Sequence, residues 1–482
     1  MMTSLGLSLF GGGAGSAVRS ASRQMQKAES YAEWRSAAQR YDRLTGQDRW
    51  REEDTSPHYD HALIRRRLDE LLRLRAGGED SKLLFALNEG IHGNLGNMGR
   101  SVLYRQSAFG TKQLIVDYVD AVVEALEHLA VEESSGISRA AKRNFFRRAS
   151  LCYGHTALML SGSGTFFFFH IGVLRALLQE GLLPAILSGS SGGAAVAAMV
   201  GTRRPEDQLS VLTVDTFHHF IQNRRRTVPT SIHRKVIQKQ QELLDEMLPD
   251  YTFEEAFETS GMAINVSIAP TDLHQSSRLL NAITSPHVCV RESVMASSAI
   301  PGIFPAVTLM AKSVDGQRQP YLPDRQWVDG SVSDDLPAKR LARLFGVNHY
   351  IVSQTNPHVL PFVTDANLDV GPLSVLRRTS QRTLRELLNG SAAMVLPSLT
   401  GRRRLTQTAN MLLSVLNQDY LGDINILPPQ PAMNPFRVLA YRSEDEAREM
   451  IRTGERATWP HLERIRIQTK VSRTLDRILA TL

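Results

Sequence analysis

From residue 156 onward, short apolar runs alternate with helical patterns, and tight glycine turns separate them. Strands that alternate with helices in this way form a mainly parallel sheet, because each crossover helix returns the chain to the same end of the sheet and covers one of its faces. The apolar runs occupy residues 157–160, 185–187, 264–268 and 349–353. The pattern therefore predicts an α/β fold over residues 151–358, with a mainly parallel sheet sandwiched by helices.

The segments on either side of this region have helical patterns. Apolar residues recur at helical spacing between residues 30 and 150, and strand alternation is absent there. After about residue 360 the chain is rich in arginine and helical, with one strand expected at 423–427 and an amphipathic end at 459–482. We therefore predict a flexible lead at 1–28, an all-helical domain at 29–150, the α/β domain at 151–358, and a helix-rich C-terminal region at 359–482 that completes or flanks the core.

Charge and cysteine content limit the partners and the compartment. The net charge of +7 is modest for 482 residues, so it suits an anionic surface without requiring nucleic acid, which we do not expect as a partner. Two cysteines, Cys152 and Cys289, exclude a disulfide framework and favour a reducing compartment such as the cytoplasm. No apolar stretch approaches the ~20 residues that a membrane-spanning helix needs.

One basic segment has two interpretations. Residues 139–148 interleave Phe145 and Phe146 with five lysines and arginines. Such a helix can lie on an anionic membrane with its aromatic side inserted. The alternative is a helix that packs on the following domain with its arginines in solvent, and this interpretation is favoured.

The most informative motif is Gly189-Ser190-Ser191-Gly192-Gly193, which follows an apolar run and precedes a helix of small residues. A serine on such a strand-to-helix turn is the nucleophile elbow of acyl hydrolases, where the helix N-terminus favours negative charge on the reacting group. The pattern predicts Ser191 as a nucleophile, with Gly189 and Gly193 allowing close packing. A merely structural glycine turn is the alternative.

A second glycine-rich loop, residues 161–165, follows the first predicted strand. Acyl transfer needs backbone N–H donors for the developing oxyanion, and such a loop supplies them. Nucleotide binding is the competing interpretation. It is disfavoured because Phe167 occupies the third glycine position of G-x-G-x-x-G and no G-K-[ST] follows.

Serine needs a base within hydrogen-bonding reach to act as a nucleophile. Asp329, in the sequence Val-Asp-Gly, is the best candidate, whereas Asp334 and Asp335 are expected to be solvent-exposed or helix-capping residues. His349 and His358 follow Asp329, so a Ser–Asp–His triad is an alternative to a Ser–Asp dyad. Sequence spacing does not choose between them.

Five motifs in order resemble the patatin-like acyl hydrolase family. They are Leu-Ser-Gly-Ser-Gly at 160–164, His-Ile-Gly-Val-Leu at 170–174, Ser-Gly-Ser-Ser-Gly-Gly at 188–193, Ser-Ser-Ala-Ile-Pro-Gly-Ile-Phe-Pro at 297–305 and Asp-Gly at 329–330. The stretch 348–358 and the helical region 30–150 are similar to the branch that includes fungal and plant triacylglycerol lipases. The resemblance covers most of the chain.

The resemblance implies a catalytic dyad of Ser191 and Asp329, without a triad histidine. We expect no cofactor, and no metal because no cluster of cysteines or carboxylates accompanies the histidines. It also implies that backbone N–H groups of Gly162, Ser163 and Gly164 form the oxyanion hole. Ser163 and Phe167 each replace a glycine of the family. Ser163 would be strained if its position needs a positive φ. On this basis, restoring glycine at position 163 is expected to preserve or raise activity.

The expected function is a serine lipid acyl hydrolase, a carboxylic ester hydrolase acting on triacylglycerol or phospholipid through an acyl-enzyme. It would act in the cytoplasm and associate peripherally with a membrane or lipid droplet. The alternative is a catalytically weak relative that binds lipid surfaces or partner proteins, which the altered glycine loop motivates. Intact Ser191 and Asp329 argue against that alternative.

Overall fold

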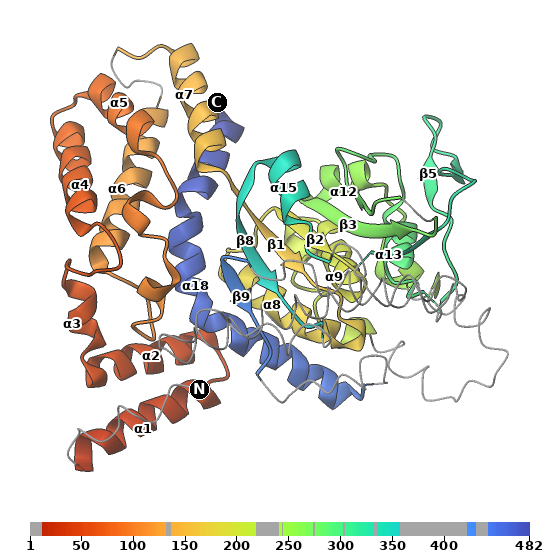
Figure 1. Cartoon of the computed structure of the whole chain (residues 1–482), viewed down its shortest axis with the longest axis horizontal. Coiled ribbons are helices and arrows are strands. Elements are labelled where there is room, and N and C mark those ends of the chain that lie inside the picture. Colours follow the sequence, from red (N-terminus) through yellow and green to blue (C-terminus); the bar gives the residue numbers. More distant parts are fainter. Residues whose placement is uncertain are drawn as a thin grey trace, which may run out of the picture. The chain divides into compact units, whose positions relative to one another are not determined.

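The computed structural model divides into two compact units, of which the first consists of two segments of the chain and the second of one (Figure 1). Unit 1 comprises Met1–His155 and Thr458–Leu482, and unit 2 comprises Thr156–Ala457. The C-terminal region expected at 359–482 is thus shared between the two units. The structure describes residues 12–131, 136–217, 241–242, 244–272, 275–301, 304–330, 335–356, 422–429 and 442–482.

Unit 1 is helical in the part that the structure describes, as predicted for the N-terminal domain (Figure 1). Its helices are α1 (Gly12–Lys27), α2 (Tyr31–Thr45), α3 (Gln47–Glu52), α4 (His61–Ala76), α5 (Asp80–Gly90), η2 (Leu95–Asn97), η3 (Ser101–Tyr104), α6 (Gln113–Ala130), α7 (Arg139–Tyr153) and the end of α18 (Glu444–Thr481). Helix α1 lies where the sequence analysis expected a flexible lead. Val18 and Ala21 are buried on α1, which packs along α2, so tertiary contacts stabilise this segment.

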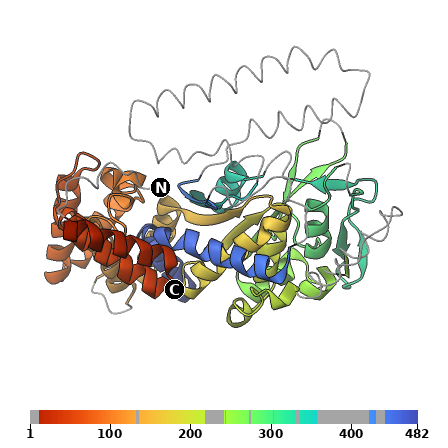
Figure 2. The same ribbon diagram turned by 90° about the horizontal axis from the view of Figure 1, so that it is seen from below.

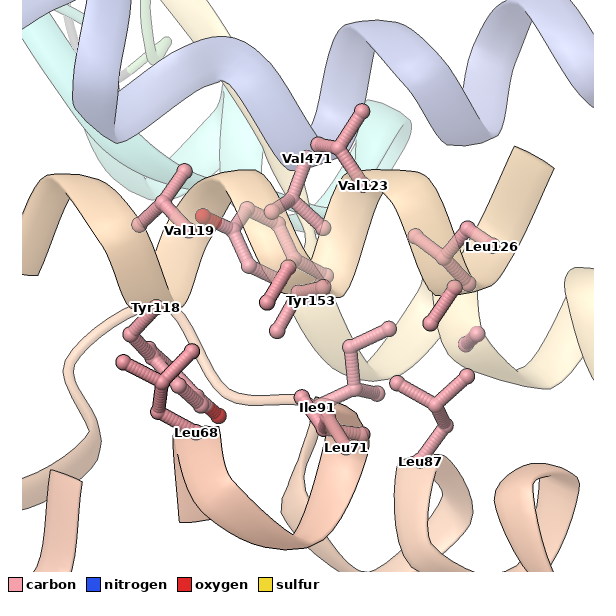
Figure 3. Close-up of a cluster of buried hydrophobic side chains, with 14 of the residues drawn as sticks. Leu68, Leu71, Leu87, Ile91, Tyr118, Val119, Val123, Leu126, Tyr153 and Val471 are labelled. Carbon is pink, nitrogen blue, oxygen red and sulfur yellow. The ribbon is translucent and has the colours of Figure 1, made fainter. Parts of the chain in front are cut away.

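The core of unit 1 is a cluster of aliphatic and aromatic side chains that includes residues of α4, α5, α6, α7 and α18 (Figure 3). Leu68 and Leu71 of α4 and Leu126 of α6 lie at helical spacing, so each helix presents one apolar stripe to the cluster. Val471 of α18 joins them, although it lies far along the chain. The end of the chain is therefore part of the core of the helical unit.

Helix α7 packs into this core through its aromatic side. Phe145 and Phe146 are fully buried, whereas Arg143, Arg147 and Arg148 are exposed. The helix is therefore packed with these arginines in solvent, as the favoured interpretation predicted, and neither phenylalanine is accessible for insertion into a membrane. Its packing partner is the core of the helical unit and not the following domain, so that part of the interpretation was wrong.

Unit 2 is built on a mainly parallel sheet, as predicted. Strand order is β4-β3-β2-β1-β8-β9, with β7 also paired to β3. The pairs β1–β2, β2–β3 and β8–β9 are parallel, whereas β4 and β7 run antiparallel to β3. The strands are β1 (His155–Leu160), β2 (Ile186–Gly189), β3 (Ala263–Pro270), β4 (Arg278–Leu280), β7 (Trp327–Asp329), β8 (Val347–Ser353) and β9 (Ile424–Ile426), and a separate hairpin pairs β5 (Met310–Lys312) with β6 (Arg318–Pro320).

Helices cover both faces of the sheet. The helices and short turns of unit 2 are η4 (Gly164–Phe166), α8 (Phe167–Gln179), α9 (Gly192–Gly201), η5 (Pro205–Asp207), η6 (Asp215–Phe217), α12 (Phe253–Ser260), α13 (Val290–Ser297), α15 (Ala338–Phe345) and the start of α18. Ala157, Ile186 and Ala263 lie side by side in register, and Leu341 of α15 packs in the same cluster. The opposite face carries Ile264, against which Gly201 of α9 packs. This alternation follows from the two-residue period of a strand.

Helices α8 and α18 cross (Figure 2), and each has a glycine at the contact. A Cβ on Gly172 would lie 1.9 Å from the carbonyl oxygen of Ile451, and a Cβ on Gly454 would lie 2.2 Å from that of Phe169. Both distances are too short for any side chain, so the helices touch through their backbones. The start of α18 thereby completes the core of unit 2.

Candidate active site

Ser191 lies on the turn between β2 and α9, where the strand–serine–helix pattern predicted it. Its backbone has φ +52° and ψ −122°, a left-handed conformation that few non-glycine residues adopt. Such a conformation costs ~1–3 kcal/mol and persists only where the surroundings impose it. The side chain is 7% exposed. The turn therefore has the strained geometry of a nucleophile elbow.

The flanking glycines are required by close backbone contacts. A Cβ on Gly189 would lie 2.5 Å from the carbonyl group of Gly193, and a Cβ on Gly193 would lie 2.5 Å from the carbonyl oxygen of Leu160. Any side chain at either position would push α9 away from β1 and β2. The two elbow glycines named from the sequence therefore allow the helix to start directly over the strands.

A serine at the end of α13 fixes the backbone of the elbow. The N–H of Ser191 donates a hydrogen bond to Ser297 Oγ at 2.9 Å, and Ser297 donates in turn to the carbonyl oxygen of Ser267 at 2.8 Å. A hydroxyl can accept one bond while it donates another, so Ser297 bridges the elbow and β3. This role of Ser297 was not predicted, although it belongs to the Ser-Ser-Ala-Ile-Pro motif.

Asp329 is buried at the end of β7 and lies close to the elbow. Gly189 faces Val266 on β3, and Asp329 faces Ile268, two residues further along. Strand β4 occupies the other side of β3 at both positions, so β2 and β7 meet end to end along one side of β3. Two residues of a strand span about 6.6 Å. The register therefore places Asp329, the last residue of β7, next to the end of β2. Ser191 follows that end by two residues.

The same stretch of chain holds Asp329 and Ser191. The N–H of Asp329 donates to the carbonyl oxygen of Ala299 at 3.0 Å, two residues after Ser297. A Cβ on Gly330 would lie 2.4 Å from the carbonyl of Ser267, which explains the glycine after the aspartate. Residues 297–299 thus contact both members of the predicted dyad.

The glycine loop after β1 has its positive φ at Gly164 and not at Ser163. Ser163 has φ −138°, whereas Gly164 has φ +50°. The left-handed position therefore falls on a glycine, and Ser163 is not strained. Within the described part of the chain, no acceptor is hydrogen bonded to the N–H of Ser163 or Gly164. These two N–H groups can bind an oxyanion.

Asp335 is a site residue that the sequence analysis interpreted incorrectly. It is 1% exposed rather than at the surface. Its Oδ1 accepts hydrogen bonds from the N–H of Gly162 at 2.7 Å and from Ser190 Oγ. One carboxylate therefore joins the glycine loop to the residue before Ser191. Asp334 lies outside the described residues.

Two histidines of unit 2, His349 and His170, have hydrogen-bond partners outside the predicted dyad. His349 Nδ1 is 3.1 Å from Oγ1 of Thr156, at the start of β1. The glycine loop begins five residues later, about 16 Å along the strand. His170 lies under the loop, where its ring hydrogen bonds with Ser353 Oγ at 2.7 Å and with the carbonyl oxygen of Ser161 at 3.1 Å. Burial lowers the pKa of His170 to about 4, so its ring is neutral at pH 7. His358 lies outside the described residues.

The described residues contain no group of three or more metal-ligating side chains, and none of their helices combines the length and hydrophobicity of a membrane-spanning segment.

Comparison with known proteins then identifies the family. Residues 158–342 match the family model described as patatin-like phospholipase, and residues 15–151 match a domain of unknown function, DUF3336. Triacylglycerol lipase ptl3 of Schizosaccharomyces pombe is 33% identical over 464 residues, which are 90% of this chain and 92% of that protein. The chain belongs to the patatin-like phospholipase family.

Other members of the patatin-like phospholipase family are longer. Triacylglycerol lipase 4 of Saccharomyces cerevisiae is 33% identical over 487 residues, covering 95% of this chain and 52% of that protein. A patatin-like phospholipase domain-containing protein of Chaetomium globosum is 32% identical over 488 residues, covering 94% of this chain and 56% of that protein. The chain spans about half the length of these two relatives.

Proposed function

We propose that this chain is a serine lipid acyl hydrolase in which Ser191 is the nucleophile and Asp329 is the base. The observation that carries the proposal is the strained elbow at Ser191, whose N–H is held by Ser297, next to the stretch that binds the N–H of Asp329. Backbone strain at a buried serine on a strand-to-helix turn is typical of catalytic serines.

In the first half of the reaction, the Asp329 carboxylate takes the proton of Ser191 Oγ as that oxygen attacks the ester carbonyl carbon. The carbonyl oxygen becomes an oxyanion in the tetrahedral intermediate. When the intermediate collapses, the bond to the alcohol oxygen breaks, and Asp329 returns the proton to the leaving alcohol. An acyl-enzyme on Ser191 remains.

In the second half, Asp329 takes a proton from water as the water oxygen attacks the acyl carbon. Collapse of this second intermediate breaks the bond to Ser191 Oγ, which recovers its proton, and releases the fatty acid. A dyad suffices for both halves because the same carboxylate alternates between base and acid.

The oxyanion is assigned to the N–H groups of Ser163 and Gly164. The N–H of Gly162, which the sequence analysis included in the oxyanion hole, donates to Asp335 instead. We assign Gly162 to holding the loop in place. A buried carboxylate that accepts this N–H orients the following two amides before substrate arrives, as oxyanion stabilisation requires.

An aromatic cluster beside the elbow supports an acyl substrate. Phe167 Cβ would lie 3.2 Å from a Cβ on Gly192, and the Phe167 ring packs with Phe168 and Phe217. Phe167 is half-buried, so part of its ring can contact an acyl chain near the nucleophile. Because two relatives are named triacylglycerol lipases, we propose triacylglycerol as the substrate.

We propose peripheral contact with a lipid surface through the exposed side of α7. Arg143, Arg147 and Arg148 lie there together with Leu151, which is 76% exposed. Cations with an exposed aliphatic side chain suit an anionic lipid surface. The cytoplasmic location expected from the cysteine content stays a prediction.

The test uses the whole chain, Ser191→Ala, and Ser210→Ala as a matched control at an exposed serine of the same unit. A fluorophosphonate probe should label the wild type and Ser210→Ala but not Ser191→Ala. Fatty-acid release should follow the same order, with more release from emulsified triacylglycerol than from phosphatidylcholine. Preference for phosphatidylcholine would instead assign a phospholipase. A folded wild type that neither reacts with the probe nor releases fatty acid, yet binds vesicles, would favour the lipid-binding alternative.

A further inference from the structure

The hydroxyl of Ser163 is buried without a partner. Ser163 is 2% exposed, and its Oγ makes no hydrogen bond with any described residue. Burial of a hydroxyl without a hydrogen bond is unfavourable, so most buried hydroxyls have partners and an exception needs an explanation. Relief of backbone strain does not provide one, because Ser163 has an ordinary negative φ.

The position of this hydroxyl points to the reaction centre. A Cβ on Gly192 would lie 2.3 Å from Ser163 Oγ, so the hydroxyl lies against the residue that directly follows Ser191. The N–H of Ser163 itself is one of the two groups that we assign to the oxyanion. Ser163 therefore places a third N–H or O–H donor at the junction of the loop and the elbow.

Burial without a hydrogen-bond partner does not by itself give a serine a catalytic role, as Ser188 shows. Ser188 Oγ is also buried without a described partner. Ser188 lies opposite Met159 in the sheet register, two residues from Ile186, so its side chain is on the face covered by α15. It therefore points away from α9 and the elbow. Ser163 differs because its hydroxyl contacts the elbow itself.

We propose that Ser163 Oγ donates a hydrogen bond to the substrate carbonyl oxygen as that oxygen becomes an oxyanion. This inference rests on the proposed function, and it makes Ser163 a catalytic residue through its side chain. A donor aimed at developing charge stabilises the transition state more than the neutral ester, so it raises kcat with little effect on KM. The hydroxyl would lack a partner in the free protein because its partner forms during the reaction.

The inference reverses the expectation drawn from the family resemblance, in which glycine at this position preserves or raises activity. Loss of one oxyanion donor typically lowers kcat by ~10²-fold. Ser163→Ala and Ser163→Gly should both show a loss of this order. Ser163→Ala should have the Tm of the wild type, because the hydroxyl has no described hydrogen bond to lose. The Tm of Ser163→Gly should fall only by the amount that the greater backbone entropy of glycine in the unfolded chain explains.

The experiment measures kcat and KM for a soluble short-chain ester, together with inhibition by a trifluoromethyl ketone. The ketone forms a charged tetrahedral adduct with a serine nucleophile, so it probes the oxyanion site directly. Ser188→Ala is the matched control, since it also removes a buried, unpartnered serine hydroxyl. For Ser163→Ala, we expect a ~10²-fold lower kcat, a similar rise in the ketone inhibition constant, and a KM within threefold of the wild type. Ser188→Ala should match the wild type in all three.

Near-normal kcat in folded Ser163→Ala and Ser163→Gly would overturn the inference. A lower kcat together with a changed KM and a lower Tm would also overturn it, because these changes together indicate that the hydroxyl is structural. Ser163→Gly also lacks the hydroxyl, so it keeps the test decisive if Ser163→Ala misfolds. Ser191→Ala separates the two proposals. If it is inactive while Ser163→Ala is normal, only the role of Ser163 fails, and if it retains turnover, the proposed function fails.

Discussion

Ser191 follows β2 and Asp329 ends β7, yet their backbone N–H groups are hydrogen bonded to one short stretch at the end of α13 and just after it, at Ser297 Oγ and at the carbonyl oxygen of Ala299. Displacement of either residue would therefore disturb the contacts of the other. The relation explains how the proposed nucleophile and base, separated by more than a hundred residues, can keep a fixed geometry.

Asp329→Asn should abolish turnover while the fold persists, because the isosteric amide cannot take the proton from Ser191. The loss should approach that of Ser191→Ala, on the order of 10⁶-fold in kcat.

His349→Ala should keep most of its activity, since this histidine lies beside Thr156 at the far end of β1. Steady-state kinetics on a soluble ester, with circular dichroism to check folding, tests both. A 10³-fold loss of kcat in folded His349→Ala would instead indicate a Ser–Asp–His triad.

Ser297→Ala should lower kcat by about tenfold or more. The substitution leaves the buried N–H of Ser191 without its acceptor, which costs ~1–3 kcal/mol and relaxes the elbow. Ser293→Ala is the control, because Ser293 is buried one turn earlier on α13 and donates within its own helix to Cys289. The rate of fluorophosphonate labelling measures the effect at Ser191 directly. Equal labelling rates in the two variants would show that Ser297 does not position the nucleophile.

Ser190→Ala and Asp335→Ala should be non-additive. Asp335 links Ser190 to the N–H of Gly162, so each substitution breaks the same connection between the elbow and the loop. We expect the double variant to have nearly the kcat of Asp335→Ala alone, with a coupling free energy of ~1–2 kcal/mol in a double-mutant cycle. Independent, additive effects on kcat would mean that the two residues do not act as a unit.

The elbow was predictable because its determinants are adjacent in sequence. A strand, two glycines and a small-residue helix surround Ser191 within about fifteen positions, and backbone contacts then leave little freedom. Asp335 was not predictable in the same way. Its partner Gly162 lies 173 residues earlier, and nothing in the local sequence distinguishes a buried aspartate from a helix cap. Strand β7 is similar, since three residues pair with β3 only through tertiary contacts.

The C-terminal helix shows a second limit of sequence reasoning. The amphipathic pattern predicted a helix from 459, whereas α18 begins at Glu444 and continues through Pro460. Proline normally interrupts a helix because it lacks an N–H and crowds the preceding turn. Here Gly454 packs on α8 before the proline, and Val471 packs in the helical core after it. Burial on both sides stabilises a helix that local propensity disfavours.

Stability should fall as the pH drops from about 6.5 to 4, partly through His170. Burial lowers its pKa from 6.5 to about 4. The unfolded chain therefore binds more protons in this range, and stability present above pH 6.5 is lost as the pH approaches 4, by up to about 3 kcal/mol from this residue. His170→Gln should have a shallower decline in urea midpoint between pH 7 and 4.5. The exposed His287→Gln is the control. Identical pH slopes for His170→Gln and the wild type would contradict the assignment.

Replacing both Arg147 and Arg148 with glutamine should weaken binding to anionic vesicles by about tenfold or more at physiological salt. Each arginine near an anionic surface contributes ~1 kcal/mol, and the attraction is screened within a Debye length of ~8 Å. Arg143 is left in place because it donates to the carbonyl oxygen of Leu482, so its loss could disturb folding.

The control replaces Arg40 and Arg73, which are exposed on α2 and α4. Sedimentation with vesicles at low and high salt measures binding, and hydrolysis of a soluble ester should stay unchanged in both variants. If the Arg147 and Arg148 variant binds as well as the control, the docking surface lies elsewhere on the chain.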